Sequence, residues 1–459
     1  MKEIRKLASA RDLPKDEVST VGQVMAVRRH GKTTFIDVHD EDAKLQCQIR
    51  LDVVGSERYD FFRRYVERGD FLGASGGLFH TRMGELTLQV GSYTILAKAL
   101  YDLPRAWFGL KDVETRYRQR YLDLLLNPEV RELFTTRSKI VNGIREFLTR
   151  RGFLEVETPL IQEHYGGAAA RPFTTHVNDL DETRFLQISP ELHLKRLIVG
   201  GFNRVFTVSK NFRNEEIDAT HNPEFTMMEA YQAYADYNDV MGLTEGLFTA
   251  LASEVWGSLK GEYDDVEVDL TPPWRRLTMY DALREYAGLD VVGMSDEDIR
   301  GALRESDPEN YERLSARGCG RGLFIAQLFD RLCQDELAQP TFVIDYPRET
   351  VPLCKIHRGD PDLIERFELF IVGMEMANAY TELNDPILQE RLFLDEERAG
   401  KGDEEAHPID ADFVEAMRYG MPPTGGLGVG IDRLVMLLTG QTSIKEVILF
   451  PMMRRLDQR

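Results

Sequence analysis

The chain has 459 residues, of which 42% are hydrophobic and 29% are charged, and its formal net charge is −20. This length exceeds what one hydrophobic core usually supports, so we expect two domains, or one large domain with an added module. The composition excludes a disordered chain. The negative charge excludes a protein that coats nucleic acid through bulk electrostatics.

The amino-terminal residues contain no apolar core of the length that a signal peptide needs, and no later stretch approaches the roughly 20 apolar residues that span a bilayer. The cysteines are far apart in the sequence and form no CxxC or Cys/His pattern: Cys47, Cys319, Cys333 and Cys354. Neither disulfides nor a zinc site is therefore expected. We expect a protein of the reducing cytoplasm with no membrane partner.

A polyanionic partner would have to bind local basic clusters. The candidates are Arg28, Arg29, His30 and Lys32, and the series Arg116, Arg118 and Arg120. Alternate spacing predicts that the three arginines of the series lie on one side of an extended segment. The alternative for either cluster is ordinary solvated surface charge.

Residues 20–100 alternate short β-rich runs with turn residues, as in VGQVMAVRRHG, TTFIDVHDED and KLQCQIRL. Between the third and fourth runs, SERYDFFRRYVERGD is typical of a helix that ends at Gly69. Five strands with a helix after the third is the order of an OB-fold. We therefore expect an OB-fold barrel over residues 1–103.

A basic, aromatic stretch between Pro104 and Pro128 predicts a linker over residues 104–128. Apolar residues at helical spacing then predict a long amphipathic helix that feeds the strand FLEVETPLI. Later runs are strand-like, except for a mostly helical insertion at about 260–335. Pairing of consecutive strands predicts a large, mainly antiparallel sheet flanked by helices over residues 129–459, an α+β architecture.

Two segments carry groups suited to a nucleotide, although no Walker A loop or GxGxxG turn is present. The first predicts a hairpin with Arg213 on one strand and Phe225 on the returning strand. The second, GGLGVGIDR, predicts a glycine-rich strand that enters a helix with Arg433 near its start, where a ligand can approach the backbone. Two arginines can clamp a triphosphate. Either arginine alone would more often be a salt-bridge partner.

These motifs resemble the three motifs of class II aminoacyl-tRNA synthetases. The strings GGAAARPF, PELHLKRL, NFRNEEIDATHNPEFTMMEAY and ELNDP are similar to those of the lysyl-tRNA synthetases in particular. The resemblance covers about residues 20–455. It implies ATP-dependent activation of L-lysine and its transfer to tRNA(Lys) by a homodimer.

The resemblance also implies roles for residues of the nucleotide site. Arg213 would hold the α-phosphate and Arg433 the γ-phosphate, both stabilising developing charge. Phe225 would stack on adenine, and the nucleotide would also meet Glu215, His221 and Asn222. Glu368 and Glu375 match the carboxylates that hold Mg²⁺ in this family. Positions seven apart on one strand point to opposite faces unless a bulge intervenes, so this pairing depends on the resemblance.

Lysine carries two ammonium groups, and both need anionic partners once they leave water. The resemblance implies a pocket made of Gly167, Glu191, Glu229, Tyr231, Asn378, Tyr380 and Glu382. Glu382 and Tyr231 would meet the side-chain ammonium, and Glu191 and Glu229 the α-amino group. Asn378 and Arg213 would meet the carboxylate. Any one of these glutamates alone would more often be surface charge.

In the barrel, Phe35 and Gln46 match positions that sandwich and read the central anticodon uridine in related synthetases. Stacking on an aromatic ring is worth about 1–3 kcal/mol per base. Arg28 would contact the tRNA backbone. Taken alone, Phe35 would more often belong to the core.

Some positions depart from the family pattern, namely Gln187, His193 and the segment from Val351 to Cys354. They leave the matched catalytic residues intact but change the pocket wall.

Three alternatives remain. An aspartyl or asparaginyl synthetase would need cationic or amide groups in this pocket. A truncated paralogue that modifies an elongation factor would lack the barrel. A non-catalytic tRNA-binding paralogue would have lost Arg213, Arg433 or the metal glutamates.

Overall fold

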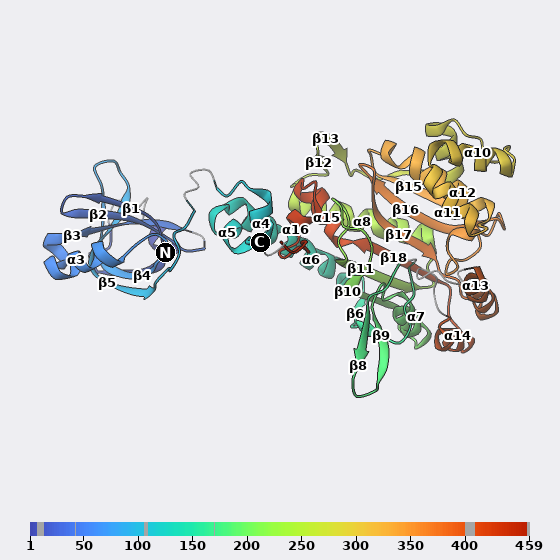
Figure 1. Ribbon diagram of the computed structural model, residues 1–459, viewed down its shortest axis with the longest axis horizontal. Helices are drawn as coiled ribbons and strands as arrows, with labels where there is room; N and C mark the ends of the chain where they lie inside the picture. The colour runs from blue at the N-terminus through green and yellow to red at the C-terminus, as the bar shows by residue number, and fades with distance from the viewer. Residues whose placement is uncertain (7–12, 42, 105–108, 169, 400–408, 457–459) are drawn as a thin grey trace. The chain divides into compact units, whose positions relative to one another are not determined.

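The computed structural model describes residues 1–6, 13–41, 43–104, 109–168, 170–399 and 409–456. The chain divides into two compact units, Met1–Phe108 and Gly109–Arg459, which Figure 1 shows as a barrel and a larger α+β body. Within the described ranges, no helix is both long and apolar enough to cross a membrane.

The first unit is a closed barrel with strand order β1-β2-β3-β5-β4. After the short helix α1 (Lys2–Lys6), its elements are β1 (Val18–His30), β2 (Thr33–His39), β3 (Lys44–Arg50), α2 (Leu51–Val54), α3 (Ser56–Tyr65), β4 (Phe71–His80) and β5 (Leu86–Ala97). Strands β3 and β5 are parallel and the other barrel pairs are antiparallel. The predicted OB-fold, with helices after the third strand, is confirmed.

Alternation along β2 and β3 separates the two faces of the barrel wall. Ile36, Val38 and Cys47 are fully buried in the barrel core. Phe35 pairs with Arg28 on β1 and with Gln48 on β3, and Asp37 pairs with Gln46. Because side chains alternate along a strand, Phe35 and Gln46 lie on the face opposite the core. Phe35 is therefore not a core residue of the barrel.

The second unit is built on an eight-stranded sheet with the order β14-β15-β16-β17-β18-β11-β10-β6. Only the outermost pairs, β14 with β15 and β6 with β10, are parallel. The strands are β6 (Leu154–Glu155), β10 (Arg204–Phe212), β11 (Glu224–Ala233), β14 (Arg275–Thr278), β15 (Thr341–Pro347), β16 (Leu363–Ile371), β17 (Met374–Thr381) and β18 (Thr424–Gly430). The mainly antiparallel sheet is confirmed.

Helices cover the sheet because each buries an apolar stripe. On α6 (Pro128–Arg150), Ile140, Ile144 and Phe147 recur every three or four residues and join the main core. That core also takes side chains from α8 (Tyr237–Val255) and α15 (Ile431–Thr439), which α16 (Ile444–Val447) follows. Helices α7 (Glu191–Val199), α13 (Pro386–Ala399) and α14 (Ala411–Arg418) form a second group around Phe413.

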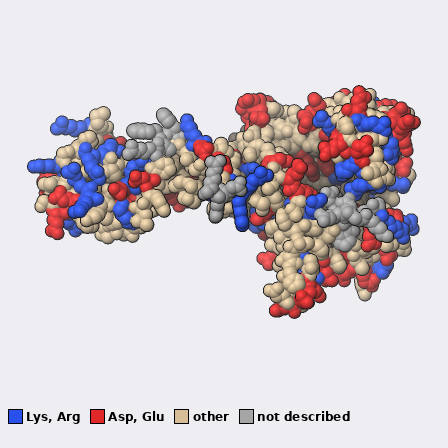
Figure 2. Space-filling view, in the orientation of Figure 1, with Lys and Arg blue, Asp and Glu red and all other residues tan. Residues whose placement is uncertain are grey.

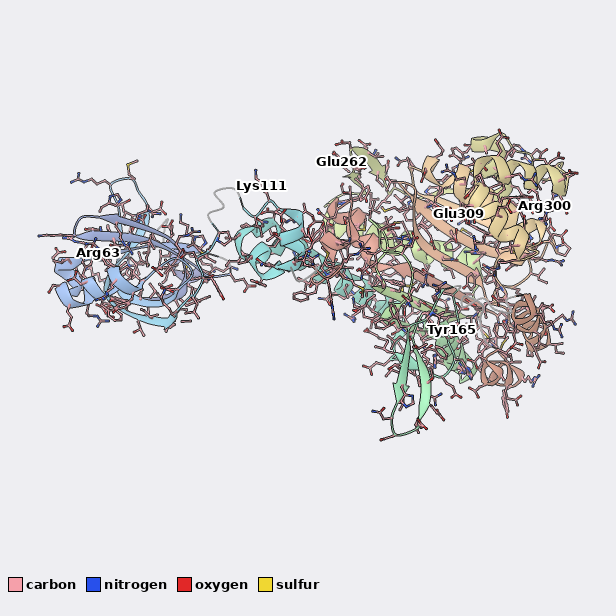
Figure 3. The ribbon with its side chains drawn as sticks, viewed as in Figure 1. Arg63, Lys111, Tyr165, Glu262, Arg300 and Glu309 are labelled. Carbon is pink, nitrogen blue, oxygen red and sulfur yellow. The ribbon has the colours of Figure 1, made fainter. Side chains whose placement is uncertain are left out.

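Two further regions flank the sheet. A three-stranded sheet of β7 (Ile161–Gln162), β8 (Thr174–Val177) and β9 (Glu182–Leu186) carries a hairpin that projects from the body (Figure 1). The expected helical insertion begins with β12 (Lys260–Tyr263), β13 (Val266–Asp269) and β14, and continues through α9 (Met279–Ala282), α10 (Asp296–Ser306), α11 (Pro308–Ala316) and α12 (Arg321–Leu332). Arg300, labelled in Figure 3, covers the ring of Phe324 and joins α10 to α12.

The expected linker contains two short helices, α4 (Val113–Arg118) and α5 (Arg120–Leu126), while residues 105–108 lie outside the described residues. The prediction that Arg116, Arg118 and Arg120 share one side of an extended segment is therefore wrong. The side chain of Asp112 caps α4 by accepting the N–H of Thr115. A helix turns each residue by about 100°, so alternate residues do not face the same way.

These arginines are ion-pair partners within the unit. Arg120 is fully buried, and its Nη1 lies 2.5 Å from Oδ2 of Asp123. Its other nitrogens donate to the carbonyls of Lys445 and Leu449. Arg116 bridges Asp123 and Glu446. The cluster ties α4 and α5 to the end of the chain.

We predict that Asp123→Ala lowers the free energy of unfolding by about 3–5 kcal/mol, because it leaves Arg120 buried without its carboxylate. Urea denaturation followed by circular dichroism measures this loss. Glu146→Ala is the control, since the pair of Glu146 with Arg150 is exposed and is worth less than about 1 kcal/mol. Equal, small losses in both variants would contradict the role of the buried pair.

Candidate active site

A cavity of about 430 Å³ lies in the second unit, against strands β11, β16, β17 and β18. Every residue predicted for ATP, the amino acid or a metal lines this one cavity: Gly167, Glu191, Arg213, Glu215, His221, Asn222, Phe225, Glu229, Tyr231, Glu368, Glu375, Asn378, Tyr380, Glu382 and Arg433. They come from segments far apart in the sequence that the sheet order brings together. The antiparallel pairings of β11 and β17 with β18 form the floor.

Arg213 is the first residue beyond β10, not a residue of the strand, and its N–H donates to the carbonyl of Pro223 across the hairpin. Its guanidinium carbon lies 5.1 Å from the centroid of the Phe225 ring. The Nε atom is buried and has no hydrogen-bond partner among the described residues. A buried donor without a partner requires an acceptor, and because Arg213 lines the cavity, a ligand bound there can supply one.

Arg433 occupies the first turn of α15, after the glycine-rich strand β18. Its Nη1 donates to the carbonyl of Glu375 at 2.8 Å, and its Nη2 lies 2.9 Å from Nε2 of His221. Arginine only donates, so Nε2 of His221 accepts, and the Nδ1 hydrogen is directed to Asp218 at 2.7 Å. A helix start that carries an arginine lining the cavity suits an anionic ligand, although Nη1 of Arg433 also lies 3.5 Å from Oε2 of Glu375.

The start of α15 is fixed by Asp432, which is almost fully buried. Oδ2 of Asp432 accepts the N–H of Thr226 on β11 at 2.7 Å. Its Oδ1 lies 2.6 Å from Nη1 of Arg137 on α6. The Asp432 carboxylate therefore fixes the start of α15 against both β11 and α6.

Three of the buried carboxylates that line the cavity lie close together, at what we call its carboxylate end: Glu191, Glu229 and Glu382. Glu229 accepts hydrogen bonds from Ser189 at 2.9 Å and Tyr231 at 3.2 Å. Burial raises the pKa of Glu229 to about 8, and the nearby charge of Glu191 adds to this effect. Glu191 accepts from the hydroxyl of Tyr380 at 3.0 Å. This end of the cavity therefore favours a cationic ligand.

Glu382 is fully buried, and its Oε2 forms an ion pair with Lys195. Its Oε1 has no hydrogen-bond partner among the described residues. A Cβ on Gly426 would lie 1.9 Å from this oxygen, so only glycine allows the approach of the carboxylate to β18. Gly167, with φ +85°, similarly leaves room for Ser189 and Glu191.

The assumption that Glu368 and Glu375 share one strand is wrong, because a turn at Val372 and Gly373 places them on β16 and β17. The pairing of β16 with β17 also shifts register between Leu369 and Phe370. Glu368 accepts hydrogen bonds from Tyr346, Arg366 and Asn378. Both glutamates line the cavity. On one continuous strand, two residues seven apart would have pointed to opposite faces.

The predicted anticodon residues form a polar network on the outer face of the barrel. Arg28 donates to both oxygens of Asp37 and to Oε1 of Gln46, and Nε2 of Gln46 donates to Thr87. Burial alone would raise the pKa of Asp37, but Arg28 and Lys44 outweigh it and hold the pKa low. Figure 2 shows Lys and Arg gathered on the visible face of this unit.

Several groups that hold these sites were not predicted: Ser189, Lys195, Tyr346, Arg366 and Asp432 around the cavity, and Asp37 and Thr87 on the barrel. One of them had a local signal. Lys195 follows Glu191 by four residues in PELHLKRL, which is the spacing of a helical ion pair. The other contacts depend on tertiary pairing.

Comparison with known proteins agrees with this arrangement. The family described as "tRNA synthetases class II (D, K and N)" matches residues 112–454, and "OB-fold nucleic acid binding domain" matches residues 18–96. A relative named "Lysine--tRNA ligase" from Methanoculleus marisnigri is 51% identical over 99% of this chain and 89% of its own length. A relative of the same name from Saccharolobus solfataricus is 54% identical over 95% of this chain and 87% of its own length.

A third relative, "Lysine--tRNA ligase 2" from Methanosarcina mazei, is 50% identical over 97% of this chain and 87% of its own length. These matches span both the barrel and the body that carries the cavity. The chain therefore belongs to the class II aminoacyl-tRNA synthetases and, within them, to the lysine–tRNA ligase family.

Proposed function

We propose that the chain is a lysine–tRNA ligase that activates L-lysine with ATP and transfers it to the terminal adenosine of tRNA(Lys). The observation that carries this proposal is one cavity lined by groups of both charges. Arg213 and Arg433 line it together with the buried carboxylates of Glu191, Glu229 and Glu382. A triphosphate and a diamino acid have the matching charges.

The carboxylate end suits lysine because both of its ammonium groups must be neutralised when they leave water. Glu382, through its unpartnered Oε1, and Tyr231 bind the side-chain ammonium. Glu191 and Glu229 bind the α-amino group. The substrate carboxylate meets Asn378 and Arg213, and the backbone of Gly167 closes this end.

Elsewhere in the cavity, Phe225 stacks on adenine, and Glu215 and Asn222 meet the nucleotide near its base. The buried Oδ1 of Asn222 has no hydrogen-bond partner among the described residues and so suits a ligand donor. Arg213 holds the α-phosphate. Arg433, with His221 beside it, holds the γ-phosphate. Both guanidinium groups are pre-positioned for charge that develops during attack.

Glu368 and Glu375 fit a magnesium ion that arrives with ATP. Mg²⁺ is usually bound by one or two carboxylates together with substrate phosphates, so a protein cage of three ligands is not needed. Within the described ranges, no cluster of three or more metal-ligand side chains occurs. Bound there, the ion would neutralise phosphate charge. Arg366 and Tyr346 hold Glu368 in place for this contact.

The reaction needs no covalent intermediate with the protein. The lysine carboxylate attacks the α-phosphate while Arg213 contacts both reacting groups, which reduces the entropic cost of their encounter. Pyrophosphate leaves from the side held by Arg433. The adenylate then acylates the terminal ribose hydroxyl, and AMP leaves. An aspartyl or asparaginyl enzyme is disfavoured, because the side chain of its substrate carries no positive charge that could bind Glu382.

We assign residues 1–103 as the anticodon-binding domain, 104–128 as the linker and 129–459 as the catalytic domain. Phe35 stacks on an anticodon base, Gln46 reads its edge and Arg28 contacts the backbone. The network from Arg28 through Gln46 to Thr87 supports this role, because it fixes the glutamine amide on the face of the barrel wall that also carries Phe35. By its family, the enzyme works as a homodimer in the cytoplasm.

Pyrophosphate exchange with each of the twenty amino acids tests the proposal, and the wild-type chain should respond to lysine alone. Arg213→Ala should lower lysine-dependent exchange about 100- to 1,000-fold, because one pre-positioned donor to developing charge is lost. Arg204→Ala, at the exposed far end of β10, is the control and should retain exchange. Exchange driven by aspartate, or a fully active Arg213→Ala, would refute the assignment.

We predict that Phe35→Ala weakens the aminoacylation of tRNA by about 1–3 kcal/mol in kcat/KM for tRNA, because a stacking surface is lost. Lysine-dependent exchange, which needs no tRNA, should stay at the wild-type rate. The matched control is Phe61→Ala, which removes an exposed ring from α3. Equal losses of aminoacylation and exchange in Phe35→Ala would exclude the anticodon role.

A further inference from the structure

Lys195 is a fully buried cation directly behind the carboxylate end of the cavity. It lies on α7, and its Nζ is 2.5 Å from Oε1 of Glu191 and in contact with Oε2 of Glu382. Burial alone would lower the pKa of Lys195, but the two carboxylates outweigh it and hold the pKa above its ordinary value. Lys195 does not line the cavity, whereas both of its partners do.

The charges around this end of the cavity match the substrate only when Lys195 is included. With a dicationic substrate bound, Glu191, Glu229 and Glu382 would be ionised, and Lys195 would neutralise one of their three negative charges. The result is a net charge of −2, which equals and opposes the two ammonium groups of lysine. Without Lys195, one carboxylate would remain buried and uncompensated, which is strongly unfavourable.

Lys195 also determines which carboxylate oxygens remain available. Both oxygens of Glu191 are engaged, one by Lys195 and the other by Tyr380. In Glu382 only Oε2 contacts Lys195, and Oε1 is left beside Gly426 without a hydrogen-bond partner among the described residues. The contact therefore holds Glu382 in the rotamer that presents one oxygen to the cavity.

We propose that Lys195 is a positioning residue that selects for a substrate with two ammonium groups, by setting the charge of the pocket and orienting Glu382. This inference rests on the proposed function. The titratable and charged groups that face Lys195 or its two partners are Glu191 on α7, Glu229 and Tyr231 on β11, Tyr380 on β17, and Glu382, Cys354 and Arg366.

The first test is lysine-dependent pyrophosphate exchange by Lys195→Met, which keeps the apolar stem and removes the charge. We expect the KM for lysine to rise about tenfold or more at pH 7 with a smaller change in kcat. Loss of the cation raises the pKa of Glu382 further, and each unit lowers the ionised fraction about tenfold below that pKa. The defect relative to wild type should therefore shrink as the pH rises from 6.5 to 8.5.

A second pair of variants separates charge matching from simple structural support. Glu191→Gln alone leaves the net charge of the carboxylate end at −1, whereas Lys195→Met combined with Glu191→Gln restores this net charge to −2. The new amide can also donate to Glu382. We expect the double variant to have a lower KM for lysine than either single variant. If Lys195 only supported the fold, the double variant would be worse than both, and the inference would be overturned.

Arg120→Met is the control for loss of a buried cation outside the cavity. It should lower the melting temperature but leave the KM for lysine and its pH profile unchanged. Should Lys195→Met fail to fold, the comparison of Glu191→Gln with the double variant still decides. Wild-type exchange that does not respond to lysine would refute the proposed function. A folded Lys195→Met variant that keeps the wild-type KM for lysine and the wild-type pH profile would refute only the role of Lys195.

Discussion

Repulsion among three buried carboxylates, Glu191, Glu229 and Glu382, is the constraint around which the catalytic unit is built. Burial raises the pKa of Glu229 to about 8 and the pKa of Glu382 well above its ordinary value. The fold compensates with hydroxyl donors from Ser189, Tyr231 and Tyr380, and with the Lys195 ammonium. The remaining negative charge favours a cationic ligand. In the proposed function, the binding energy and the specificity for lysine therefore have the same electrostatic origin.

The antiparallel sheet makes this concentration of charge possible. Strand β18 lies between β11 and β17, so residues of the hairpin, the glycine-rich segment and the carboxylate strand face one cavity. Gly426 lets Glu382 approach the backbone, and Asp432 fixes α15 against β11 and α6. The guanidinium groups of Arg213 and Arg433 line the same cavity as these carboxylates. The cavity therefore presents both positive and negative groups to a ligand.

Much of this arrangement was predictable from local sequence. The alternation of short β-rich runs with turn residues predicted the barrel, and apolar residues at helical spacing predicted α6. The glycine run before Arg433 predicted β18 and α15. Contacts between distant segments were not predictable. Arg116 and Arg120 were misread because only one of their partners, Asp123, is near in the sequence, whereas Glu446 and the carbonyls of 445 and 449 are more than 300 residues away. Glu368 and Glu375 were placed on one strand because no Pro or Asn marks the turn at 372–373. The second partner of Lys195, Glu382, is equally remote.

The most direct measurement of the central claim is calorimetric binding of L-lysine beside two analogues that each lack one ammonium group. Norleucine lacks the side-chain ammonium, and 6-aminohexanoate lacks the α-amino group. Each omission should weaken binding by about 100-fold or more, because it leaves a desolvated carboxylate without its partner. Norleucine that binds as tightly as lysine would contradict the account.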